Sequence, residues 1–220
     1  MADTVTTRVV ETRWWWVRHA PVTVNQGRIY GQQDLPCDTG DTEAFAGLAK
    51  MLPTDSVLVT SALMRAHQTA DAIRAAGLAM PERIEFDALN EQSFGDWQGL
   101  THEEFGFSGT LGSSGRYWLA PAYERAPNGE SFTDVIARVV PTILEVTEKH
   151  AGRDIVAVTH GGTIRAALCY ALNLDPESAL RFSTENLSVT RLDCVDTDEG
   201  RHWRIGFSNR NPREKHPERA

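Results

Sequence analysis

Apolar and β-branched runs alternate along the chain with stretches in which apolar residues recur at helical spacing. The runs are short and bounded by polar or turn-forming residues, a pattern typical of buried strands. The predicted strands cover residues 13–17, 56–60, 83–86, 154–159, 188–193 and 202–207. The last two of these strands are expected to be antiparallel neighbours.

The stretches between these runs predict helices, because their apolar residues recur every three or four positions. The predicted helices cover 42–51, 63–75, a stretch that begins at Phe132, and 163–172. Ser61 is expected to be the N-cap of the second helix, because its hydroxyl can accept from a free backbone N–H. Pro141 lies inside the third and is expected to kink it.

Strands that alternate with helices favour a mostly parallel sheet covered on both faces, so the predicted fold is a three-layer αβα sandwich. One domain is expected over residues 1–208, with a small cap at about 92–130, where Gly, Ser and Pro are frequent. The charged segment 209–220 is expected to be a flexible tail. Three tryptophans occupy positions 14–16, and at least two are expected to pack inside, because their area is costly to leave in water.

Composition narrows the function classes. The chain has 220 residues, 41% of them hydrophobic, and a formal net charge of −8. No basic stripe indicates a nucleic-acid partner, and no apolar run approaches the roughly 20 residues that span a bilayer. The three cysteines, Cys37, Cys169 and Cys194, show neither zinc nor disulfide spacing. Together with a polar N-terminus unlike a signal peptide, these features indicate a cytoplasmic protein.

Residues able to do chemistry follow four of the predicted strands at the same relative place. The carboxyl ends of parallel strands line one crevice, so two histidines, two arginines and one carboxylate are expected to converge there. They are Arg18 and His19 after the first strand, Arg65 after the second, Glu91 after the third, and His160 with Gly161 and Gly162 after the fourth.

These residue types suit phosphoryl transfer. Arginine offers a fork of donors that matches phosphate oxygens and offsets the charge that develops on them. A neutral imidazole can attack phosphorus, and a glutamic acid can protonate the leaving oxygen. Glycines that open a helix let backbone N–H groups approach an anion. The sequence contains no H-E-x-x-H, Walker or GxGxxG motif, so neither a metal nor a cofactor is expected.

With these residues in place, the sequence resembles the histidine phosphatase superfamily, also called phosphoglycerate-mutase-like. The resemblance runs from about Trp14 to about Asp193. Residues 17–20 (VRHA) resemble the Arg-His-Gly signature of the family, and Asn25 stands where the family has a phosphate-contacting asparagine. The other matching blocks are 60–70, 89–91 with 94–99, and 159–165.

The resemblance implies a role for each site residue. The implied catalytic residues are His19 as the phosphorylated nucleophile, Glu91 as the proton donor, and Arg18, Arg65 and His160 as the phosphate pocket. The implied substrate-binding residues are Asn25, Gly161 and Gly162. Two positions depart from the family pattern. Ala20 replaces the usual glycine, which would carry strain if φ were positive there, and Val22 replaces a common Ser or Thr.

Three functions remain open: a phosphatase acting on a small phosphomonoester, a phosphoglycerate mutase, and a non-catalytic phospho-ligand-binding module. The catalytic groups are all present, which disfavours the binding module. The stretch from Glu91 to His160 is too short for the longer insertion with which mutases exclude water, and this disfavours a mutase. Residues 94–101 and 128–131 resemble the phosphatase branch, including α-ribazole phosphatases. The expected partner is a small phosphomonoester, with no nucleic acid or membrane, and a homodimer is left open.

Aromatic residues suggest the shape of the substrate. Planar groups pack well on aromatic faces, so α-ribazole 5′-phosphate is the leading candidate. A sugar acid would need extra cations, and the stretch 106–129 offers only Arg116 and Arg125. The aromatic residues expected to form the pocket wall are Phe94, Trp97, Tyr117, Trp118 and Tyr123.

Overall fold

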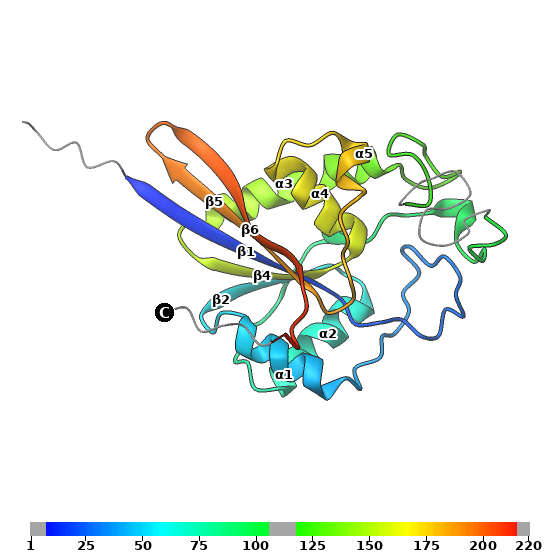
Figure 1. Cartoon of the computed structure of the whole chain (residues 1–220), viewed down its shortest axis with the longest axis horizontal. Helices are drawn as coiled ribbons and strands as arrows, with labels where there is room; N and C mark the ends of the chain where they lie inside the picture. The colour runs from blue at the N-terminus through cyan, green and yellow to red at the C-terminus, as the bar shows by residue number, and fades with distance from the viewer. Residues whose placement is uncertain (1–7, 106–117, 215–220) are drawn as a thin grey trace, which may run out of the picture.

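The computed structural model describes residues 8–105 and 118–214 of the chain. Its centre is a six-stranded sheet of order β3-β2-β4-β1-β5-β6. Strands β1 to β4 are parallel, and β5 and β6 form an antiparallel hairpin at one edge (Figure 1). The strands are β1 (Val9–Arg18), β2 (Ser56–Thr60), β3 (Ile84–Glu85), β4 (Asp154–Thr159), β5 (Val189–Thr197) and β6 (Gly200–Arg210).

Helices cover both faces of this sheet, which confirms the predicted αβα sandwich with its mostly parallel sheet. Helices α3 and α4 lie on one face, and α1 and α2 lie on the other (Figure 1). The helices are α1 (Thr42–Met51), α2 (Met64–Ala75), α3 (Phe132–Lys149), α4 (Gly161–Ala171) and the single turn α5 (Pro176–Ala179). Helix α3 continues through Pro141. Within the described ranges, no helix is long and apolar enough to cross a membrane.

The three tryptophans show why β1 belongs in the middle of the sheet. Side chains alternate along a strand, so Trp14 and Trp16 share one face and Trp15 points to the other. Trp14 and Trp16 are fully buried and stack with ring centroids 4.8 Å apart. The indole N–H of Trp14 donates to the Thr147 hydroxyl of α3 at 2.9 Å. This confirms that at least two of the tryptophans pack inside.

The first residues of segment 209–220, which was expected to be a flexible tail, are ordered. Strand β6 continues to Arg210, and Pro212 is buried. The backbone of Pro212 lies so close to α1 that a Cβ at Gly47 would clash with its carbonyl group. Arg213 forms an ion pair with Asp41, the N-cap of α1. Packing against α1 therefore orders the first residues of this segment, and residues 215–220 lie outside the described ranges.

Candidate active site

The first strand and the fourth bring the two histidines together. Strands β1 and β4 pair in parallel with Arg18 opposite Thr159, so His19 and His160 follow at the same edge. The His19 backbone N–H donates to the Thr159 carbonyl at 2.9 Å. The two imidazole rings are 5.0 Å apart between centroids, and both are completely buried.

His19 is held in the form that a nucleophile needs. Its Nδ1 lies 2.7 Å from the Ala20 carbonyl oxygen, which can only accept, so Nδ1 carries the hydrogen. Nε2 therefore carries the lone pair in the neutral ring, and it has no hydrogen-bond partner among the described residues. Burial, and then the charges of Arg18 and Arg65, hold the pKa of His19 well below its ordinary value. The ring is neutral at neutral pH, and Nε2 is its unprotonated nitrogen.

Ala20 fits its position without strain. Its φ is not positive, so the cost anticipated for replacing the family glycine does not arise. The Ala20 backbone N–H donates to the Thr69 hydroxyl at 2.9 Å, and that hydroxyl donates to the Arg65 carbonyl at 2.6 Å. These two bonds join the loop that carries His19 to the helix that carries Arg65.

Arg65 and His160 form a second buried unit. The Arg65 guanidinium is completely buried and donates to the carbonyls of Gln33 and Gly31 at 2.8 and 2.6 Å. Its Nε lies 3.3 Å from His160 Nδ1. Burial, followed by the charge of Arg65, lowers the pKa of His160 well below its ordinary value. A cation and a neutral ring thus lie side by side. Because Arg65 Nε donates to His160 Nδ1, the ring hydrogen of His160 is on Nε2.

Ser61 orients His160, and its predicted role as a helix cap is wrong. Helix α2 begins after Leu63, which makes no side-chain capping bond. The Ser61 hydroxyl instead lies 2.7 Å from His160 Nε2, across 99 residues of sequence. The local capping pattern was misleading because the stronger partner comes from a distant strand end. Only the tertiary structure reveals this contact.

Glu91 lies beside the first turn of α4 and is 7% exposed. Its Oε1 accepts from the backbone N–H groups of Gln92 and Gly162, both at 3.0 Å. A Cβ at Gly162 would lie only 2.4 Å from that oxygen, so the close approach requires glycine. In this structure the Gly162 N–H thus holds the carboxylate, and its expected contact with substrate stays a prediction. At Gly161, an added Cβ would lie 3.0 Å from the Arg165 guanidinium.

A cavity of about 300 Å³ opens beside Arg18 and Glu91. Asn25 lines it, and its side-chain amide donates to the Arg28 carbonyl at 2.8 Å. The residues that line the cavity are Arg18, Asn25, Arg28, Ile29, Tyr30, Gly31, Glu91, Phe94, His102, Trp118, Leu119 and Arg165.

The aromatic wall differs in part from the expected one. Phe94 and Trp118 line the cavity as predicted, and Tyr30 joins them. Trp97 does not, because it packs against Phe105 with ring centroids 4.8 Å apart. Tyr123 is 63% exposed and contacts Asp175 instead. Tyr117 and Arg116 lie outside the described residues, and Arg125 forms an ion pair with Asp134.

Arg165 is a cavity residue that the sequence reasoning did not single out. It is 8% exposed, its Nε donates to the Phe182 carbonyl at 2.8 Å, and its guanidinium lies 4.5 Å from the Trp118 ring centroid. Burial, and then the charge of Arg18, lowers its pKa to about 10. Within the described part of the chain it forms no ion pair with an acid. Its position one turn after Gly161 was the available signal, since residues four apart share a helix face.

The positive charge gathered here contrasts with the net charge of −8 for the whole chain. Arg18, Arg28 and Arg165 line the cavity and Arg65 lies beside the histidines. Residues 8–105 and 118–214 contain no cluster of three His, Cys, Asp or Glu side chains able to hold a metal ion. Among these residues, the arginines are the groups that can offset phosphate charge.

The family model of the histidine phosphatase superfamily (branch 1) matches residues 14–206. The chain belongs to this superfamily. It is 32% identical over 168 residues to a 2,3-bisphosphoglycerate-dependent phosphoglycerate mutase of Cytophaga hutchinsonii, covering 73% of this chain and 78% of that protein. It is 31% identical over 180 residues to the metal-independent phosphoserine phosphatase of Arabidopsis thaliana, covering 80% and 74%.

The solved structures agree with this assignment. A structure described as mycobacterial hydrolase 2 superposes on this histidine phosphatase superfamily member with a TM-score of 0.76. The two share 29% sequence identity, and the match covers 92% of each chain. Relatives of this member thus include both phosphatases and mutases, and the choice between these activities depends on the site itself.

Proposed function

We propose that this protein is a phosphomonoesterase that hydrolyses a small phosphorylated metabolite through a covalent phosphohistidine on His19. The observation that carries the proposal is the state of His19. Its Nδ1–H is fixed on the Ala20 carbonyl, and its buried Nε2 has no partner among the described residues. Two arginines and a second histidine surround it, which is the arrangement an incoming phosphoryl group needs.

In the first step, Arg18 and Arg65 hold the phosphate oxygens and offset their charge. The Nε2–H of His160 turns from the Ser61 hydroxyl to donate to one of these oxygens. His19 Nε2 attacks phosphorus, and the bond from phosphorus to the leaving oxygen breaks. A protonated Glu91 gives its proton to that oxygen. Both backbone donors bind Oε1 of Glu91, so Oε2 is the oxygen that carries the proton.

In the second step, water replaces the alcohol that has left. Glu91 takes a proton from the water as its oxygen attacks phosphorus, and the bond between phosphorus and His19 Nε2 breaks. Inorganic phosphate leaves, and both side chains return to their starting forms. The bond from Nδ1–H to the Ala20 carbonyl keeps the ring oriented throughout, because Nδ1 never loses its hydrogen.

The test compares His19→Ala with His202→Ala, which removes an exposed histidine on β6. Each protein is mixed with a radiolabelled phosphomonoester and quenched rapidly. His19→Ala should lose both turnover and the acid-labile, base-stable phosphoenzyme, and His202→Ala should keep both. Full turnover by a folded His19→Ala protein would refute the mechanism.

We further propose that α-ribazole 5′-phosphate is a candidate substrate. The aromatic side chains of Tyr30, Phe94 and Trp118 at the cavity support a leaving group that carries a planar base. The test measures kcat/KM for α-ribazole 5′-phosphate, simple sugar phosphates and 3-phosphoglycerate. A preference for a compact sugar phosphate would reject this candidate and leave the phosphatase mechanism intact.

A phosphoglycerate mutase is the second candidate function. The identity with the mutase of Cytophaga hutchinsonii favours it, and so do Arg28 and Arg165, which can bind a substrate carboxylate. The two functions differ in the fate of the phosphoryl group. Isomerisation of 3-phosphoglycerate faster than release of inorganic phosphate would establish the mutase.

A further inference from the structure

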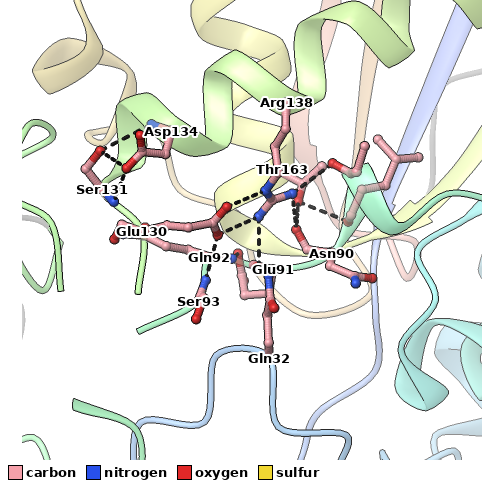
Figure 2. Close-up of polar contacts among 12 residues, drawn as sticks. Gln32, Asn90, Glu91, Gln92, Ser93, Glu130, Ser131, Asp134, Arg138 and Thr163 are labelled. Carbon is pink, nitrogen blue, oxygen red and sulfur yellow. Dashed lines mark hydrogen bonds and ion pairs between the residues drawn. The ribbon is translucent and has the colours of Figure 1, made fainter. Parts of the chain in front are cut away.

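Every N–H group of the Arg138 guanidinium, on α3, donates a hydrogen bond either to the segment that carries Glu91 or to Glu130 (Figure 2). One terminal nitrogen donates to the carbonyls of Ala88 and Asn90 at 2.8 and 2.9 Å. The other donates to the Glu91 carbonyl at 3.0 Å. Arginine has five such donors, and all five are satisfied here.

Glu130 binds Arg138 from the other side, and the two side chains together form a clamp on the Glu91 segment. Its carboxylate receives Arg138 Nε and a terminal nitrogen at 2.7 and 3.0 Å, the paired geometry of a strong charge-assisted contact. The same carboxylate accepts the Ser93 backbone N–H at 2.8 Å, and the Glu130 backbone exchanges further bonds with Gln92 and Ser93 (Figure 2). The clamp therefore grips the chain on both sides of Glu91.

The segment around Glu91 has little other regular structure to hold it. It runs between two short 3₁₀ turns, η1 (Asp87–Leu89) and η2 (Gly95–Trp97), and belongs to no strand. Helix α3, in contrast, is eighteen residues long and begins with a capping box. Arg138 thus connects an irregular segment to a rigid element, which is how proteins fix a functional side chain.

Arg138 does not line the cavity. Its side chain is 21% exposed and that of Glu130 is 20% exposed, and its contacts are with backbone oxygens and Glu130 rather than with the cavity. It is therefore placed to act on the reaction through Glu91 and not through the substrate.

We propose that Arg138, locked by Glu130, is a positioning residue that sets the location of the Glu91 carboxyl group for proton transfer. The inference rests on the proposed function, in which Glu91 is the acid. General acid catalysis depends on hydrogen-bond reach, and a displacement of about 1 Å can cost roughly a hundredfold in rate. Three carbonyls within four residues converge on one guanidinium, so lysine cannot reproduce the contact.

The test uses leaving-group dependence, because a purely structural role would not produce it. Arg138→Met keeps the apolar stem and removes the fork. With a poor leaving group, such as an alkyl phosphate, kcat should fall about 10- to 100-fold, part of the usual worth of a general acid. With p-nitrophenyl phosphate, whose leaving group needs no proton, the loss should stay within about threefold. Arg125→Met, which removes an exposed ion pair at the start of α3, should change neither rate.

A double mutant shows whether Arg138 acts through Glu91. In a Glu91→Gln background there is no acid left to position, so adding Arg138→Met should cost no further loss on the alkyl ester. Equal losses of Arg138→Met on both esters, or full additivity with Glu91→Gln, would overturn the inference. If Glu91→Gln itself shows no leaving-group dependence, the acid assignment fails instead, so the two failures are distinct. Should Arg138→Met not fold, Glu130→Gln carries the same test with the same outcomes.

Discussion

We expect Gly162→Ala to lower the activity of this protein without lowering its stability. The added Cβ would lie 2.4 Å from Glu91 Oε1, whereas ordinary contacts begin at about 3.4 Å. To remove this clash, the Cβ and the Glu91 oxygen must therefore move apart by about 1 Å. The carboxyl group is the free end of a flexible side chain and moves more easily than backbone. It would then lose its bond from the Gly162 N–H.

The expected effects follow from that displacement. A 1 Å shift of a catalytic group costs roughly a hundredfold, so kcat for alkyl phosphates should fall by about that factor. The loss for p-nitrophenyl phosphate should be much smaller. Stability should hold or rise, because alanine favours helix over glycine by about 1 kcal/mol and Gly162 lies in the first turn of α4.

The assay combines steady-state kinetics on both esters with thermal unfolding followed by circular dichroism. Gly40→Ala in an exposed loop is the matched control and should leave the kinetics unchanged. A Gly162→Ala protein that hydrolyses alkyl phosphates at the normal rate would refute the reasoning. A large drop in Tm would show that backbone, and not Glu91, moves to make room.

Four further predictions address other parts of the site. Burial and neighbouring arginines lower the pKa of the His19 ring, so the unfolded chain binds more protons than the folded protein near pH 6. The free energy of unfolding should therefore fall as the pH drops below about 6.5. Urea denaturation from pH 8 to pH 5 measures this. Ser61→Ala should lower kcat/KM about tenfold with little change in Tm, because one hydrogen bond that orients His160 is lost; an unchanged rate would contradict that role. Arg165→Gln should raise the inhibition constant of inorganic phosphate about tenfold through the loss of a buried cation, as measured by competition. Prolonged EDTA treatment should leave turnover unchanged, and activity restored only by a divalent ion would contradict this.

Much of the fold could be predicted because its signals are local. Strands β2 and β4 and helix α1 begin and end where the pattern placed them, since turn-forming residues bound each one. The meeting of His19 and His160 also followed, because the carboxyl ends of parallel strands share an edge. The predicted bounds of β3, β5 and β6 were less accurate, because pairing with neighbouring strands sets where these strands end.

The contacts that escaped prediction connect residues distant in sequence. Ser61 has a correct local environment for a cap, yet its partner is His160. Arg138 lies on a helix whose apolar stripe was recognised, but nothing in that stripe indicates three carbonyls near Glu91. Trp97 belongs to a motif of the family and still packs away from the cavity. Composition and spacing identify chemical groups, whereas their partners depend on the assembled chain.

The central place of β1 affects how this chain assembles during synthesis. β1 is the first of the described strands, but its two neighbours in the sheet, β4 and β5, come much later in the sequence. The stacked tryptophans and the loop that carries His19 must wait for partners that are translated much later. Such distant pairing slows folding and leaves apolar surface exposed to chaperones in the meantime. It also means that the proposed site is complete only after His160, which follows β4, has been translated.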